Sequence, residues 1–208
     1  IQSENLMVDY SIENEYREKG FNIICGVDEA GRGPLAGPVY AAAVILPSDC
    51  VIEGLNDSKK LTGKKRESLF DEIKEKALAY GIASADEKEI DEINILNATF
   101  LAMKRAIASL SVKPDLALID GNQKPHTDIE EVTVIKGDAK SMSIAAASVL
   151  AKVSRDRFML EMAEKYPQYE FARHKGYGTK LHYEKIAQYG VCDIHRRTFL
   201  KKILGEQK

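Results

Sequence analysis

Four carboxylates lie beside glycines, each directly after an apolar stretch of strand type: Asp28, Glu29, Asp120 and Asp138. Neighbouring side chains of a strand point to opposite faces, so Asp28 and Glu29 cannot both be buried on one side. If these strands are neighbours in one sheet, their ends converge and all four carboxylates share one crevice. Such carboxylates repel one another and raise each other's pKa, and a bound cation removes that penalty. We therefore expect a cation site.

The chemistry of this site follows from its ligand type. Oxygen ligands suit Mg²⁺ or Mn²⁺ rather than zinc. Phosphodiester hydrolysis uses two such ions ~3.5–4 Å apart, and four carboxylates are enough to hold them, whereas a glycosidase needs only two acids. The alternative is a set of separate surface acids at loop entrances, which is the usual position of a single Asp. Four acids in three similar settings favour the cluster.

The elements that must position these acids are strands and amphipathic helices. The expected strands cover residues 21–27, 37–46, 50–53, 81–85, 116–119 and 132–135. The first two are close enough in sequence to pair as an antiparallel hairpin. Thr62 is the expected N-cap of one helix, apolar residues spaced 4, 3, 4 and 3 from Leu96 to Leu110 predict a second, and residues 141–165 predict a long third.

Hairpin strands early in the chain and strands alternating with helices later indicate the α/β class. We expect a mixed β-sheet flanked by helices, with a helical C-terminal region of two shorter helices. Residues 1–20 are expected to form an N-terminal helical extension and residues 21–208 a single domain. The small residues at the start of the long helix would allow another chain to approach it closely.

Charge is divided unevenly along the chain. Residues 1–135 hold 15 Lys and Arg against 24 Asp and Glu, a net of −9, whereas residues 136–202 hold 14 against 7, a net of +7. Such an imbalance is a hint of a face that binds polyanions. Alternatively, the two parts mix in three dimensions and the surface is neutral.

Composition favours a soluble globular protein, with 44% hydrophobic and 30% charged residues. Apolar runs are too short to span a bilayer, and no basic-then-apolar leader opens the chain, so we expect a cytoplasmic monomer without membrane contact. Because the sequence begins with Ile1, we expect native residues before it. The three cysteines match neither a disulfide framework nor a CxxC zinc spacing.

Several separate motifs, in order, resemble bacterial ribonuclease HII, the type 2 ribonuclease H. They are GVDEAGRGPLAGPVYAAAVILP, NDSKKL, DGN, KGDAKSMSIAAASVLAKVSRD and HKGYGT, within residues 21–200. The sister family ribonuclease HIII is disfavoured, because its members typically have lysine in the glycine turn, where this chain has Arg32, and a larger N-terminal domain.

The resemblance implies a ribonuclease H-like fold and metal-dependent cleavage of RNA in RNA/DNA hybrid duplexes. Cutting would fall 5′ to a ribonucleotide, including a single one embedded in a DNA duplex, and leave 3′-hydroxyl and 5′-phosphate ends. Carried over residue by residue, the catalytic and metal-binding acids are Asp28, Glu29, Asp120 and Asp138, with two Mg²⁺ or Mn²⁺ ions as cofactors. No acid of the family's set is missing.

Distinguishing RNA from DNA requires detection of the 2′-hydroxyl. Gly31 and Gly33 lack side chains, so the backbone can press against a sugar. In the family the corresponding Gly-Arg-Gly turn, here with Arg32, reads the ribose together with the tyrosine that matches Tyr177. Without the resemblance, a tyrosine between glycines is more simply a loop anchor.

Phosphate contacts are expected from lysines and from a helix N-terminus. The candidates are Asn56, Lys59, Lys60, Ser141 and Ser143. By spacing, His174, His182 and His195 do not form a metal cluster, and we assign them no ligand role.

Two other functions fit parts of the sequence. A non-catalytic nucleic-acid-binding module would explain the glycine turn and the charge asymmetry, and predicts salt-sensitive binding without cutting. Another two-metal nuclease of the same fold would act on all-DNA duplexes. One cleavage assay on a DNA duplex with a single ribonucleotide, run beside an all-DNA duplex, separates all three.

Overall fold

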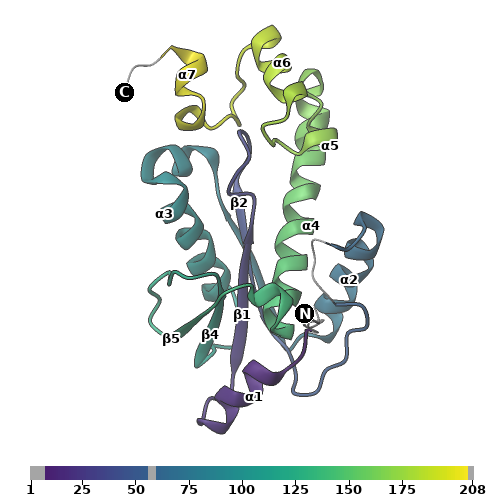
Figure 1. The fold of residues 1–208 in the computed structure, drawn as a ribbon, viewed down its shortest axis with the longest axis vertical. Coiled ribbons are helices and arrows are strands. Elements are labelled where there is room, and N and C mark those ends of the chain that lie inside the picture. Colours follow the sequence, from purple (N-terminus) through teal and green to yellow (C-terminus); the bar gives the residue numbers. More distant parts are fainter. Residues whose placement is uncertain (1–7, 56–59, 206–208) are drawn as a thin grey trace, which may run out of the picture.

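A five-stranded sheet forms the centre of the molecule (Figure 1). The computed structural model describes residues 8–55 and 60–205. The strands are β1 (Ile24–Ala30), β2 (Val39–Ile45), β3 (Ala79–Ala85), β4 (Leu116–Asp120) and β5 (Glu130–Val134), in the order β3-β2-β1-β4-β5.

The sheet is mixed, as predicted. β1 and β2 pair antiparallel with Cys25 opposite Ile45, and β3 continues this meander on the far side of β2. β1, β4 and β5 run parallel, which requires crossover connections, and α3 makes the crossover before β4. β1 is therefore the strand at which antiparallel pairing gives way to parallel pairing.

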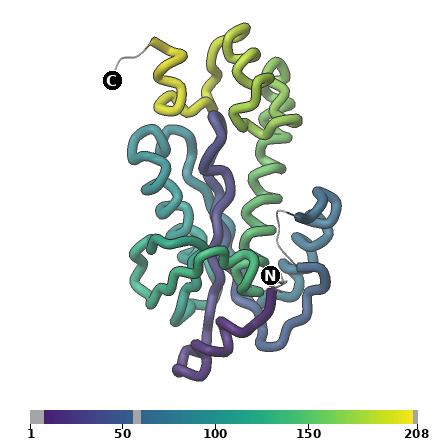
Figure 2. The backbone as a smooth tube through the Cα atoms, viewed as in Figure 1, coloured from purple at the N-terminus to yellow at the C-terminus, as the bar shows by residue number. Residues whose placement is uncertain are grey.

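Helices cover both faces of the sheet and one end of it (Figures 1 and 2). The long ones are α2 (Gly63–Lys76), α3 (Glu87–Ala108) and α4 (Met142–Lys165); the shorter ones are α1 (Ser11–Glu18), α5 (Phe171–His174), α6 (Lys180–Tyr189) and α7 (Lys201–Leu204). Across the described residues, no helix is both long enough and apolar enough to cross a bilayer.

The two faces of the sheet are covered by different helices. α3 packs on β2 and β3, with Ala98, Ala102 and Ala106 among the buried side chains of that layer. α4 packs on β1 and β2 on the other face, and α2 packs beside α4. The C-terminal region is helical, as predicted, and the structure places it at one end of the sheet, where Ala36 forms a β-bridge with His195.

The predicted close approach at the start of α4 occurs within the chain. A Cβ added to Gly26 of β1 would lie 2.2 Å from the carbonyl carbon of Ser143, closer than any side chain permits. Small residues at this crossing therefore let the long helix rest directly on the central strand. That contact sets the distance between α4 and the residues that follow Gly26 in β1.

Three details differ from the predictions. β1 begins and ends three residues later than expected, so Asp28 and Glu29 lie inside the strand and not beyond it. Residues 51–55, with Cys50 before them, do not form the short strand predicted near 50–53; instead, the Tyr10 hydroxyl donates to the Cys50 carbonyl at 2.6 Å. Asp138 does not follow β5 directly but lies in a 3-10 turn, Gly137–Ala139.

The N-terminal helix α1 contributes a buried carboxylate to the start of α4. Glu13 has no exposed surface, and its Oε1 accepts from the Ser141 hydroxyl at 2.6 Å and from the Ser143 N–H at 3.1 Å. A carboxylate at a helix N-terminus is favourable because the macrodipole is positive there. The Met142 N–H donates to the Asp9 carbonyl, so the first turn of α4 is capped by the N-terminal segment.

Replacing Glu13 tests this cap. Glu13→Ala leaves the Ser141 hydroxyl and the Ser143 N–H buried without their acceptor, and we expect the free energy of unfolding to fall by about 1–3 kcal/mol. Urea denaturation followed by circular dichroism measures the change. The exposed neighbour substitution Glu15→Ala removes only a surface ion pair with Lys19 and serves as the control. Equal stability of the two variants would contradict the capping role.

Candidate active site

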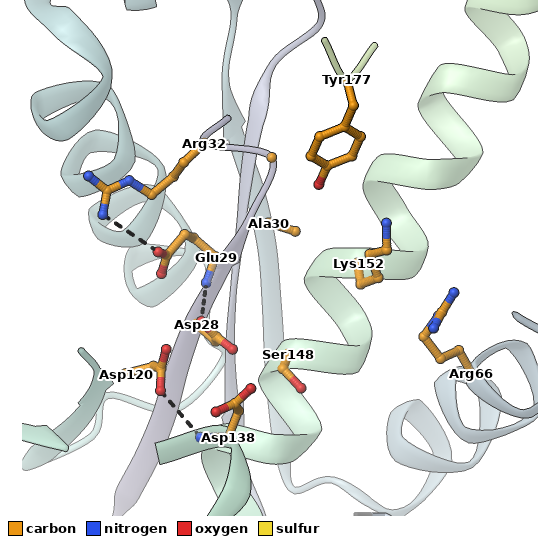
Figure 3. Close-up of a pocket in the computed structure, with 11 residues that line it drawn as sticks. Asp28, Glu29, Ala30, Arg32, Arg66, Asp120, Asp138, Ser148, Lys152 and Tyr177 are labelled. Atoms are coloured by element: carbon orange, nitrogen blue, oxygen red, sulfur yellow. Dashed lines mark hydrogen bonds and ion pairs between the residues drawn. The ribbon is translucent and has the colours of Figure 1, made fainter. Parts of the chain in front are cut away.

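Parallel pairing of β1 with β4 brings the first three acids together. Val27 lies opposite Ile119, so Asp28 and Asp120 follow at the same level of two adjacent strands. One oxygen each from Asp28, Glu29 and Asp120 lies within 4.8 Å of the others, a spacing that one metal ion can bridge. The predicted convergence of these acids is therefore present in the fold (Figure 3).

The fourth acid reaches the same place by another route. Lys136 adopts the left-handed conformation, with φ 54°, and turns the chain into the short 3-10 segment that carries Asp138. The Asp138 N–H donates to Asp120 Oδ1 at 3.2 Å, which ties this turn to the end of β4. Asp138 therefore joins the cavity from the turn that precedes α4, and not from a strand end. We call Asp28, Glu29, Asp120 and Asp138 the acid cluster.

The electrostatics of the acid cluster fit a bound cation. Burial raises the pKa of Asp28 well above its usual range, and the carboxylates of Glu29 and Asp120 raise it further. Burial and Asp120 also raise the pKa of Glu29, while Arg32 lowers it. Among the described residues, buried Oε2 of Glu29 has no hydrogen-bond partner. Mutually repelling carboxylates with an unused buried oxygen are the donor set that a hard divalent ion takes.

One cavity of about 490 Å³ contains the acid cluster together with predicted sugar-reading residues. Gly31, Arg32 and Tyr177 line it, although they come from parts of the chain far apart in sequence. Gly33 is exposed and does not line it. Arg32 reaches toward the acid cluster and pairs with Glu29 at 3.9 Å.

Three polar lining residues were not predicted: Arg66, Ser148 and Lys152. Figure 3 shows Lys152 and Arg66 across the cavity from the carboxylates. Ser148 and Lys152 are four residues apart, so they lie on one face of α4, and Arg66 comes from α2. The sequence feature that could have identified Ser148 and Lys152 is that they are polar residues within the run of small residues in α4. Arg66 could not be placed because its position depends on how α2 packs on α4.

Tyr177 stands over two cations. Its ring centroid lies 5.7 Å from Lys152 Nζ and 5.6 Å from the Arg155 guanidinium carbon. The side chain remains 39% exposed, so its hydroxyl is accessible from the cavity. Tyr177 therefore combines a supported ring with an accessible polar end.

The predicted phosphate contacts have different positions. Ser141 and Ser143 are buried, and the cap that Glu13 and Asp9 provide uses the donors of this helix start, so the structure does not support phosphate contacts there. Lys60 is exposed but does not line the cavity. Asn56 and Lys59 lie outside the described residues.

Three histidines that are distant in sequence come together in the C-terminal region: His174, His182 and His195. The rings of His174 and His182 stack at 4.2 Å, and His182 Nε2 lies 2.9 Å from His195 Nε2. All six ring nitrogens have hydrogen-bond partners, so none is left to bind a metal. Spacing did not reveal this cluster, because tertiary packing alone creates it.

The hydrogen bonds assign the protons of this chain of rings. The Cys192 N–H donates to His195 Nδ1, so the His195 proton is on Nε2 and donates to His182 Nε2. His182 must then carry its proton on Nδ1, which donates to the Tyr177 carbonyl at 2.9 Å. Two neutral imidazoles therefore support the main chain of Tyr177. A second proton on His182 Nε2 would break the link between the two rings, and a second proton on His195 Nδ1 would break the hydrogen bond from the Cys192 N–H.

Removal of metal should expose the repulsion in the acid cluster. The pKa of Asp28 is higher in the folded protein than in the unfolded chain, so the folded protein holds this proton more tightly. The resulting stabilisation is fully present below the unfolded pKa and is lost as pH rises through the folded pKa. Asp28→Asn removes the charge and keeps an acceptor for the Glu29 N–H. In chelator at pH 7 we expect its free energy of unfolding to exceed that of wild type by about 1 kcal/mol.

The matched measurement adds Mn²⁺ to both proteins. The melting temperature of wild type should rise with Mn²⁺ concentration, because the ion binds only the folded chain. The rise should be smaller for Asp28→Asn. Equal stabilisation of both proteins by Mn²⁺ would place the ion elsewhere.

The histidine chain predicts acid sensitivity. Burial lowers the pKa of His182 and of His195 from 6.5 to about 4. Between pH 6.5 and pH 4, these two histidines are therefore protonated in the unfolded chain but neutral in the folded protein. The stabilisation is complete above pH 6.5 and is lost as pH falls toward 4. The free energy of unfolding, measured by urea denaturation at several pH values in this range, should change less steeply with pH for the double variant His182→Gln, His195→Gln than for wild type. His126→Gln, at an exposed histidine, is the control; an unchanged slope in the double variant would contradict the prediction.

Comparison with known proteins gives a consistent result. A sequence model of the family described as Ribonuclease HII matches residues 25–202. A Ribonuclease HII of Caldicellulosiruptor bescii is 58% identical, covering 94% of this chain and 95% of that protein, and one of Acetivibrio thermocellus is 59% identical over 92% and 75%.

The fold has the same relatives. The crystal structure of the ribonuclease H2 from Pyrococcus horikoshii OT3 superposes with a TM-score of 0.74 at 29% identity, covering 89% of this chain and 97% of that one. The chain belongs to the ribonuclease HII family of metal-dependent endoribonucleases.

Proposed function

We propose that this protein hydrolyses the RNA strand of RNA/DNA hybrids and cuts 5′ to ribonucleotides embedded in duplex DNA. The products are a 3′-hydroxyl and a 5′-phosphate. One observation carries the proposal: the acid cluster lines the same cavity as Gly31, Arg32 and Tyr177, so hydrolysis and sugar recognition act on neighbouring atoms of one nucleotide.

The acid cluster provides the sites for divalent ions, Mg²⁺ or Mn²⁺. When bound, such ions activate the attacking water and stabilise the leaving oxygen of an in-line displacement. The role of the four carboxylates is to hold these ions in a fixed arrangement at the end of β4 and beside the turn after β1. The raised pKa values of Asp28 and Glu29 and the unused Glu29 oxygen support this role.

The chain's own residues would orient the nucleic acid. The main chain at Gly31 and Arg32 and the hydroxyl of Tyr177 would contact the ribose in the cavity. Lys152 and Arg66, across the cavity from the carboxylates, would supply positive charge for the phosphates that flank the cut. Lys152 also pairs with Asp156 at 3.0 Å, so part of its charge is already balanced within α4.

The alternatives explain fewer of these observations. A non-catalytic binding module has no use for mutually repelling buried carboxylates, because like charges at a polyanion site weaken binding. A nuclease for all-DNA duplexes has no use for a tyrosine and a glycine turn that meet beside the acids. The combination favours a ribonucleotide-directed enzyme.

The decisive experiment compares one acid at each end of β4. Asp120 lies at the C-terminal end beside the cavity, whereas Asp115 precedes the strand and accepts the N–H groups of Asn22 and Ile23. Asp120→Asn should lower Mg²⁺- or Mn²⁺-dependent cleavage about a thousandfold or more while leaving the circular dichroism spectrum unchanged. Asp115→Asn, the matched control, should cut at nearly the rate of wild type.

Three duplexes complete the test: a DNA duplex with one ribonucleotide, an RNA/DNA hybrid and an all-DNA duplex. Wild type should cut the first two and leave the third intact. Undiminished cutting by Asp120→Asn would exclude the acid cluster as the catalytic centre. All-DNA cutting at a similar rate would favour the DNA nuclease, and salt-sensitive binding without any cutting would favour the binding module.

A further inference from the structure

A buried arginine in the C-terminal region holds the turn that follows β1. Arg196 has no exposed surface, and its guanidinium donates to three main-chain carbonyls: Gly31 at 2.6 Å, Arg32 at 2.8 Å and Gly37 at 2.8 Å. Its own N–H donates to the Leu35 carbonyl, so both ends of the residue are attached to the same segment. Within the described part of the chain, no carboxylate forms an ion pair with Arg196.

These hydrogen bonds determine which way the peptide groups of the turn face. In a planar trans peptide, the carbonyl and the following N–H point in opposite directions. Because Arg196 binds the carbonyls of Gly31 and Arg32, the N–H groups of Arg32 and Gly33 must face away from it. Neither N–H donates a hydrogen bond to any described part of the chain. Two oriented donors are therefore available at the turn.

A second buried arginine closes the other side of the turn. Gly31 has φ +91°, and a Cβ added to it would lie 2.1 Å from Arg155 Nε. Arg155 in turn donates to the carbonyls of Ala36, Pro38 and Lys175 and lies under the Tyr177 ring. The turn is thus enclosed by protein on two sides, which leaves its two N–H groups little freedom to rotate.

We propose that Arg196 is a positioning residue for ribose discrimination. By binding the Gly31 and Arg32 carbonyls, it presents two N–H groups to the 2′-hydroxyl of the substrate: that of Arg32, which lines the cavity, and that of the next residue, the exposed Gly33. The inference rests on the proposed function. It concerns sugar selection only, since Arg196 donates to no carboxylate of the acid cluster.

The substitution Arg196→Lys keeps a positive charge but removes the planar fork that reaches three carbonyls at once. Binding should be measured in chelator, where no cutting occurs, to a DNA duplex with one ribonucleotide and to the same duplex in all-DNA form. We define the ribose preference as the dissociation constant for the all-DNA duplex divided by that for the duplex with one ribonucleotide. We expect Arg196→Lys to lower this ratio about tenfold, corresponding to two weakened hydrogen bonds, with little change in all-DNA binding.

The matched control is Leu200→Ala. Leu200 is buried in the same region, in a cluster with Leu35 and Ile186, and its truncation weakens this packing but removes none of the hydrogen bonds from Arg196 to Gly31 and Arg32. Its ribose preference should equal that of wild type. If Arg196→Lys also retains the wild-type preference, or loses affinity for both duplexes equally, Arg196 is only structural and the inference is wrong.

A second variant covers the possibility that Arg196→Lys does not fold. The ring of Phe199 lies 5.1 Å from the Arg196 guanidinium carbon, and Phe199→Leu loosens that support while keeping an apolar side chain. A smaller loss of ribose preference is expected, and a preference equal to wild type would overturn the inference. If wild type itself neither cuts nor prefers the ribonucleotide duplex, the proposed function fails; if wild type does both and only the variants disagree, the inference alone fails.

Discussion

Repulsion between like charges, held in place by the pairing of β1 with β4, is the constraint on which the site depends. The register places Asp28 and Asp120 side by side, and the Asp138 turn is attached to Asp120 by a main-chain hydrogen bond. Burial makes this repulsion stronger, since fewer waters screen it. The carboxylates therefore repel one another as long as no cation is bound, and a bound divalent ion would remove this repulsion.

The buried cations of the protein are kept away from these acids. Arg155 and Arg196 are almost fully buried, and each donates to three main-chain carbonyls instead of to a carboxylate. A buried guanidinium paired with Asp28 would cancel the charge that attracts an ion. Carbonyl acceptors allow the arginines to join the C-terminal region to residues 31–38 while the acid cluster keeps its negative potential. The exposed Arg32 pairs with Glu29, at 3.9 Å.

Local patterns predicted most elements but not their exact relation to the acids. Apolar runs located five strands, and the helix N-cap at Thr62 was predicted correctly because a threonine side chain can accept a hydrogen bond from the first turn of a helix. The strand near residues 50–53 was wrong, since an apolar pair in a short connection does not ensure a pairing partner. Asp138 was assigned to a strand end because nothing local distinguishes that from a 3-10 turn.

The sequence by itself indicated the chemistry of the acids: four carboxylates beside glycines predict a cation site, because residue type sets what a side chain can bind. The roles of the Gly-Arg-Gly turn and of Tyr177 followed from the family resemblance that the sequence carries. Only the tertiary structure decided which of the other residues are accessible. Ser141 and Ser143 became buried because Glu13 caps their helix, and Lys152 and Arg66 entered the cavity because α2 packs on α4. The hydrogen-bonded histidines and the hydrogen bonds from Arg196 to the turn also join segments that are far apart in sequence. Such contacts produce no local sequence pattern from which they could be predicted.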